Sequence, residues 1–254
     1  MLWYKSWLDT RWRFLLGLAL LLVFACGTVV SFSTVQELIN SVSPSAISGS
    51  EDLRQEFEES VELMRTFRGY VWLQWFQQNF SGLLTLFAAL LGSGSLLVQA
   101  GSGALFSLAL PVSRGRWIAA RAGAGLAELL VLALAPSVAF AALAPLFGQQ
   151  YSVAEALVYG TCAFVGASTF FGIAVYVSSL VNDVWRPLLL TCLAAVAIGA
   201  VGLALPEGHG LFTAMAGGNY FEDGSLPWID LLVSAAVAAG LLYAAAANVA
   251  RRDF

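Results

Sequence analysis

The chain has 254 residues, of which 59% are hydrophobic and only 11% are charged, and its formal net charge is −4. Soluble domains carry about 25% charged residues, so this chain has too few charges to cover a globule in water. Its mean hydropathy of +0.79 points the same way. The composition therefore excludes an ordinary soluble protein and indicates an integral membrane protein.

The apolar residues form continuous runs of about 20 residues, the length that crosses a hydrocarbon core of about 30 Å. Continuous rather than alternating runs predict helices, which satisfy their own backbone hydrogen bonds in lipid. We predict a single all-α domain over residues 1–254, an integral membrane bundle of six transmembrane helices. The predicted spans are 14–32, 80–98, 122–147, 153–180, 188–205 and 229–249.

The first 13 residues mix aromatic and basic side chains. This pattern suits an N-terminal interfacial helix lying on the cytoplasmic leaflet. It also suits an ordinary aromatic belt with a positive flank, and the two interpretations overlap. We expect the span that follows to be retained rather than cleaved, because no small-residue cleavage site comes after it.

The external loop 33–79 begins with a Ser-rich linker and continues with an amphipathic pattern. Apolar residues recur there at spacings of three and four, and Asp and Glu fill the intervening positions. The apolar positions are Leu53, Phe57, Val61, Met64, Phe67 and Val71. We expect an external helix between spans one and two, acting either as a lid or substrate-contacting helix or as a cover packed on the outer mouth of the bundle. The rings that follow, Trp72, Trp75 and Phe76, predict an outer membrane interface.

The distribution of basic residues orients the chain. With both termini in the cytoplasm, nine of the 12 Lys and Arg residues lie inside, as the positive-inside rule requires. These nine are Lys5, Arg11, Arg13, Arg114, Arg116, Arg121, Arg186, Arg251 and Arg252. We therefore predict a multi-pass protein of the plasma (inner) membrane with cytoplasmic termini.

The sequence lacks the residue patterns of an enzyme. The single histidine, His209, lies in an external loop, and no zinc motif, nucleophile elbow or phosphate loop is present. The three cysteines fall within apolar runs, and we interpret them as small buried hydrophobic residues. Glu222 and Asp223 suit a solvated turn better than an acid–base pair. We predict no catalytic residue, metal site or bound cofactor, which argues against an intramembrane enzyme.

Two charged features lie in or near the spans. Glu128 falls in the third span, where a central charge costs roughly 3 kcal/mol, so it should face protein or water, or be protonated. It is either a pathway or coupling residue, or the partner of Arg121 or Arg116 near the cytoplasmic end. Asp183 and Arg186, three residues apart, predict a weak ion pair at a helix end.

The segment "GALFSLALPVSRGRWIAARAGAG" between spans two and three resembles a known family. Gly103-Ala104-Leu105 and Pro111-Val112-Ser113-Arg114 are similar to the cytoplasmic segment of permeases in the type-2 exporter family of ATP-binding cassette (ABC) transporters. The six predicted spans and the interfacial N-terminus agree with that family. Many members carry charges just before this segment, whereas this chain has the uncharged run 99–102. Docking here would therefore depend more on Arg114, Arg116 and shape.

The resemblance implies a permease subunit that forms half of a translocation pathway. A coupling segment at 103–116 would rest on a cytoplasmic ABC ATP-binding subunit. ATP and Mg would be bound by that partner, present in two copies. A second permease copy, or a similar chain, would complete the pathway in the lipid, and no nucleic acid is implied. The implied coupling residues are Gly103, Leu105, Leu108, Pro111, Val112, Ser113, Arg114 and Arg116. The alternative is a membrane scaffold or assembly factor without transport activity of its own.

Overall fold

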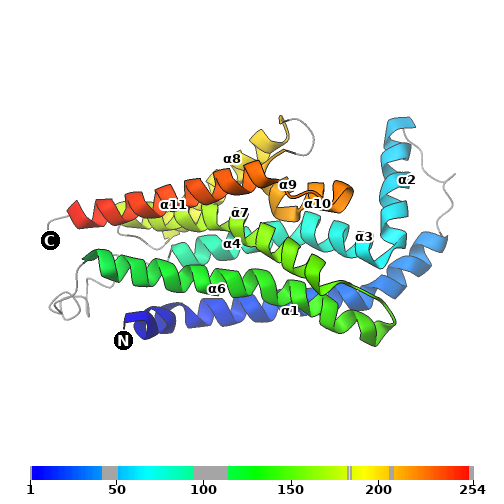
Figure 1. Ribbon diagram of the computed structural model, residues 1–254, viewed down its shortest axis with the longest axis horizontal. Coiled ribbons are helices and arrows are strands. Elements are labelled where there is room, and N and C mark those ends of the chain that lie inside the picture. The colour runs from blue at the N-terminus through cyan, green and yellow to red at the C-terminus, as the bar shows by residue number, and fades with distance from the viewer. Residues whose placement is uncertain are drawn as a thin grey trace.

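The computed structural model describes residues 2–41, 51–93, 114–181, 183, 185–205 and 209–251. Among helical residues, the side chains of 2, 5, 9, 51–56, 114 and 115 are not described. Within these ranges the ordered elements are helices, which confirms the all-helical prediction. Figure 1 shows long helices lying along one axis, with the N-terminus and the C-terminus at the same end.

Five helices are long and apolar enough to cross a membrane. In chain order these five helices are α1 (Leu2–Ser41), α6 (Arg114–Leu143), α7 (Val153–Leu180), α8 (Trp185–Gly202) and α11 (Trp228–Arg251). The predicted range 153–180 has the same bounds as α7, and the predicted ranges 188–205 and 229–249 begin or end within three residues of α8 and α11. A short turn, η4 (Ala144–Phe147), extends α6.

The predicted span 80–98 differs from the structure. The helix there ends at Gly92, because Gly and Ser residues follow it, and it begins earlier than expected. Three consecutive elements make one helical stretch: α3 (Phe67–Val71), the π-helix η2 (Trp72–Phe80) and α4 (Ser81–Gly92). α4 alone has only 12 residues.

This helical stretch runs antiparallel to α1. At one end the rings of Phe32 and Phe67 lie 5.2 Å apart, and at the other the Arg13 guanidinium donates to the Leu90 carbonyl at 2.9 Å. The part of α1 between Phe32 and Arg13 is about 28 Å long at 1.5 Å per residue. The stretch 67–92 therefore covers nearly the thickness of a hydrocarbon core.

The N-terminal segment also differs from the expectation of a separate interfacial helix. Residues 2–13 continue without a break into the first span as part of the 40-residue α1, because no Gly or Pro interrupts them. The rings of Trp3, Tyr4 and Trp12 remain exposed.

The amphipathic segment of the external loop forms α2 (Glu51–Arg65), which ends before Thr66 caps α3. Figure 1 shows α2 standing across the bundle axis at the end opposite the termini. Phe57 is exposed and Val61 and Met64 are half-buried. α2 is therefore held at its base rather than laid flat over the bundle.

α7 lies at the centre of the bundle. In its most apolar 18-residue window 67% of the residues are buried, against 11% for α8. α8 turns Leu189, Leu193 and Val196 outward, as a helix facing hydrocarbon does. Association of helices in lipid depends on close packing rather than on a hydrophobic driving force.

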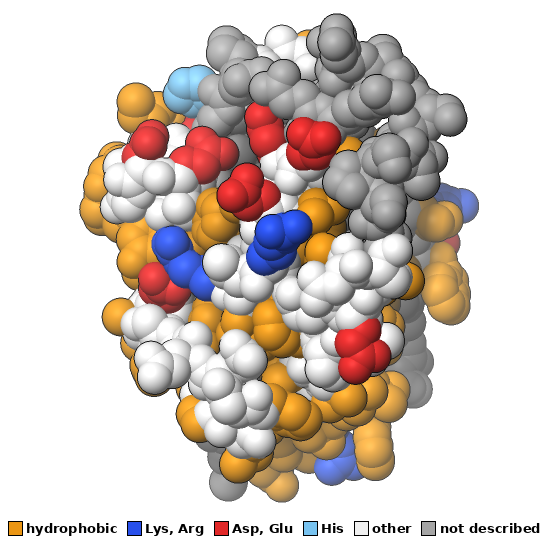
Figure 2. Space-filling model, turned by 90° about the vertical axis from the view of Figure 1, so that its right-hand side faces the viewer, with side chains coloured by type: hydrophobic (Ala, Val, Ile, Leu, Met, Phe, Trp, Pro, Cys, Tyr) orange, Lys and Arg blue, Asp and Glu red, His pale blue; other side chains and the backbone are white. Residues whose placement is uncertain are grey.

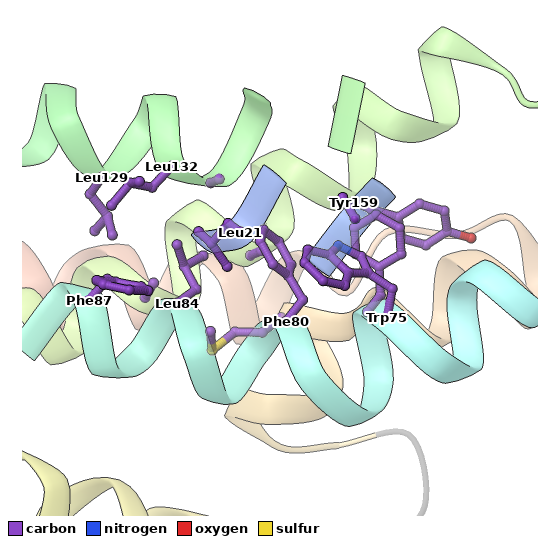
Figure 3. Packing of buried hydrophobic residues seen from close by; sticks show 14 of the residues in the cluster. Leu21, Trp75, Phe80, Leu84, Phe87, Leu129, Leu132 and Tyr159 are labelled. Carbon is purple, nitrogen blue, oxygen red and sulfur yellow. The ribbon is translucent and has the colours of Figure 1, made fainter. Parts of the chain in front are cut away.

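The core is built from two kinds of side chain. Aromatic rings fill the end near α3, and aliphatic side chains with Phe87 fill the other end (Figure 3). Phe80 stacks on Trp75 with ring centroids 5.2 Å apart. Trp72, Trp75 and Phe76, which the sequence assigned to the outer interface, are at most 6% exposed. They face protein: Trp75 and Phe76 pack against the Phe140 ring of α6, and Trp72 stacks on the Phe221 ring.

Gly92 permits a close approach of α4 and α7. A Cβ placed there would lie 2.6 Å from the Ala174 Cβ and 2.8 Å from the Phe171 carbonyl oxygen. We expect Gly92→Ala to lower the free energy of unfolding by about 1–3 kcal/mol through overpacking. Gly82→Ala in the same helix is the control, because nothing lies within 4 Å of its Cβ position. Thermal unfolding in detergent measures both, and equal stability of the two variants would contradict the packing.

Candidate functional site

One end of the bundle is basic, and we call it the basic end. Arg116 and Arg121 lie in the first turns of α6, Arg186 in the first turn of α8, and Arg251 at the end of α11. Arg13 reaches the last turn of α4. These helix ends meet at the end of the bundle that carries both termini (Figure 1). The sequence predicted this gathering of basic residues from the order of the spans alone.

The predicted coupling segment is attached to this basic end at both of its ends. Its residues Gly103, Leu105, Leu108, Pro111, Val112 and Ser113 lie outside the described residues. Before the segment, α4 ends at Gly92; after it, α6 begins at Arg114. The side chain of Arg116 is exposed.

Polar contacts tie the neighbouring helix ends together. The Ser178 hydroxyl donates to the Gly92 carbonyl at 3.2 Å, which joins α7 to the end of α4. The Asn248 amide donates to the Ser179 carbonyl at 2.9 Å and to its hydroxyl at 3.1 Å, which joins α11 to α7. Each bond links a side chain to another helix, so the ends of α4, α7 and α11 are held as one unit.

Glu128 lies near this unit and is only 5% exposed. The Thr10 hydroxyl of α1 donates to its Oε1 at 2.6 Å, and it also lies 3.1 Å from the Ser6 carbonyl oxygen. Arg121 is close enough for its charge to act on the carboxyl. Among the described residues Glu128 Oε2 has no hydrogen-bond partner.

The contact with Thr10 gives the depth of Glu128. Thr10 precedes Arg13 by three residues, about 5 Å along the helix, so Glu128 lies level with the basic side chains of α1 rather than at mid-bundle. Sequence reasoning weighed Arg121 and Arg116 as partners and missed Thr10, because Thr10 is 118 positions away. A cavity of about 10 Å³, lined in part by Ser6, Thr10 and Arg121, lies beside the pair. It is too small for any solute larger than water.

The opposite end carries a cation among aromatic rings, which sequence reasoning also missed. The Arg68 Nε lies 3.2 Å from Glu155 Oε2, and the guanidinium carbon lies 5.0 Å from the centre of the Phe221 ring. Burial raises the pKa of the nearby Tyr151 hydroxyl above its usual range. Arg68 and Glu155 are 87 positions apart, so no local spacing signals this pair.

The remaining polar features are consistent with structural roles. Arg186 pairs with Asp183 at 3.3 Å, as their spacing predicted, and both side chains are exposed. The His209 Nδ1 lies 3.5 Å from Asp230 Oδ2 on the outside of the bundle. Glu222 and Asp223 are exposed at the end of α10 (Gly218–Asp223). Over the described part of the chain, no three His, Cys, Asp or Glu side chains converge as metal ligands.

Comparison with known proteins found no relative of this chain. No family model, no curated protein and no solved structure matches this chain.

The Thr10–Glu128 bond should stabilise the fold. Thr10→Val removes the donor and leaves a buried carboxyl without its partner, which should lower the free energy of unfolding by about 1–3 kcal/mol. Thr28→Val in α1 is the control, because the Thr28 hydroxyl donates to the Phe24 carbonyl of its own helix. Thermal unfolding in detergent compares the two. A Thr10→Val loss no larger than that of the control would contradict the role of the bond.

Proposed function

We propose that this chain is the permease subunit of an ABC exporter. It forms half of a translocation pathway in the plasma (inner) membrane, with both termini in the cytoplasm. Residues 103–116 act as the coupling segment on a separate cytoplasmic ATP-binding subunit, which binds ATP and Mg. Two such subunits and a second permease, either a copy of this chain or a similar chain, complete the transporter.

The observation that carries the proposal is the attachment of the coupling segment to the basic end. The segment contains Pro111-Val112-Ser113-Arg114, and it joins α4 to α6 where Arg13, Arg116 and Arg251 gather. Basic residues favour the cytoplasmic side of a membrane. A segment at that side is accessible to a soluble partner, which is what coupling to an ATPase requires.

The contacts at this end suggest how a push on the segment would reach the membrane helices. The segment leads directly into the 30-residue helix α6, so displacement of one moves the other. α6 holds α1 through Glu128 and Thr10 and through the Trp3 ring, which packs over Gly123. Closure of two ATP-binding subunits would thus rock α6 and α1 together.

The stretch from α3 to α4 supports a sixth span. It extends from Phe67 to Gly92 beside α1 and covers about the thickness of the hydrocarbon core. With it the bundle would have six spans, and this even parity would put both termini on one side of the membrane. This parity agrees with Figure 1, where N and C are at the same end.

The second candidate function is a membrane scaffold or assembly factor without transport of its own. The small size of the cavity beside Glu128 favours it, because among the described residues this cavity is too small for a solute larger than water. A pathway between two copies would answer this objection.

Co-purification tests the proposal. We expect the tagged full-length chain, extracted from its native membrane in mild detergent, to bring down an ATP-binding subunit in stoichiometric amount. Arg114→Glu should reduce recovery of that subunit at least tenfold, because tenfold corresponds to about 1.4 kcal/mol and a like-charge contact at an interface costs more than that. Arg65→Glu is the matched control, a reversal at the end of α2, away from the basic end. Mass spectrometry quantifies the partner.

Two outcomes would count against this function. If no ATP-binding subunit accompanies the chain in several detergents, the result supports the scaffold function instead. If Arg114→Glu and Arg65→Glu recover the partner equally, with both variants inserted normally, the segment does not dock.

The orientation has its own test. Green fluorescent protein fused after Phe254 should fluoresce, and alkaline phosphatase fused at the same point should be inactive, because the basic residues hold this end in the cytoplasm. The reverse pair of signals would contradict the orientation.

A further inference from the structure

A pocket of about 210 Å³ lies beside η2, next to the short helices α9 (Leu211–Ala216) and α10. It is near the end opposite the basic end, where Figure 2 shows acidic and basic side chains with hydrophobic ones between them. Its lining includes two aromatic rings, two amides, a hydroxyl and a carboxylate. These belong to Trp72, Phe212, Gln77, Asn219, Thr213 and Glu222.

The protein itself holds the aromatic walls in place. The Trp72 Nε1 donates to the Ala216 carbonyl at 3.0 Å, and the Trp72 ring stacks on Phe221 at 4.2 Å with only 9° between the planes. The Phe212 ring stacks on Phe170 at 5.6 Å. A ligand therefore need not order these rings, which lowers the entropic cost of binding.

The polar groups of the pocket, in contrast, are not engaged. Within the described part of the chain, the side chains of Gln77, Asn219 and Glu222 make no hydrogen bond or ion pair with another residue. Gln77 and Glu222 are exposed and Asn219 is half-buried. Their donors and acceptors are available to water or to a ligand.

The position of Gln77 argues against exposure to lipid. Gln77 lies in η2, on the stretch 67–92 that runs beside α1. An exposed amide is costly against hydrocarbon, so we expect this side of η2 to face a polar space. η2 is moreover a nine-residue π-helix, and π-helical turns occur frequently at functional sites.

The charge of the lining selects the ligand. Among the described residues, Glu222 is the single charged residue lining the pocket, and the walls beside it are aromatic. A carboxylate favours a cation, and aromatic rings attract organic ammonium groups while they also pack apolar groups. We infer that this pocket binds a small organic cation that carries an apolar group, with its ammonium at Glu222 and its apolar part against Trp72 and Phe212. This binding goes beyond the proposed export and needs neither the ATPase nor transport.

Equilibrium binding of phenethylammonium tests the inference, because this probe combines an ammonium with a phenyl ring. The full-length chain in nanodiscs is dialysed against the labelled amine at pH 7, and binding to empty nanodiscs is subtracted. We expect saturable binding, and about tenfold weaker binding of 2-phenylethanol, which lacks the charge. Glu222→Gln should weaken binding of the amine about tenfold as well.

Asp223→Asn is the matched control. Asp223 is also exposed and is adjacent in sequence, but it does not line the pocket, so its variant should change affinity less than about twofold. Thermal unfolding verifies that both variants fold like the parent chain. Three results would each overturn the inference: no saturable binding up to about 10 mM amine, equal binding of the alcohol, or equal effects of the two variants. None of these depends on whether an ATP-binding subunit co-purifies.

Discussion

Close packing around α7 is the constraint on which the rest of the structure depends. Helices in lipid gain little by hiding apolar surface from one another, so they associate where small residues let their backbones approach. Gly92 lies against Ala174 and the Phe171 carbonyl, and the serines of α7 bond to α4 and α11 at the same level. Because α7 is held on several sides, α1 and α8 can turn apolar faces outward.

The two ends of the bundle have different chemistry. The basic end combines arginines with the ends of α4 and α11 and with a buried carboxyl that bonds to a threonine. The opposite end combines the Arg68–Glu155 pair with stacked rings and with a pocket whose described lining includes the Glu222 carboxylate. A membrane sets two different aqueous phases at the two ends of a bundle. The proposed soluble partner would bind at the basic end, and the proposed small organic cation at the opposite end.

The π-helix η2 connects the packing with the pocket. A π-helical turn is wider than an α-helical one, and here the side chain of Asn79 donates to the Gln74 carbonyl five residues earlier at 2.6 Å. The stretch buries Trp75, Phe76 and Phe80 on one side and exposes Gln77 and Gln78 on the other. One short segment thus supplies both the aromatic core and the polar wall of the pocket.

The sequence by itself determined the helical class, the bounds of α7 and the basic end, because run length, composition and charge are local properties. Only the tertiary structure decided that Trp72, Trp75 and Phe76 face protein, that Glu128 bonds to Thr10 and that α9 and α10 complete a pocket with η2. Each of these depends on residues far apart in the chain. Which face of a helix meets a neighbour is set by the packing of all helices together, and no local pattern records it.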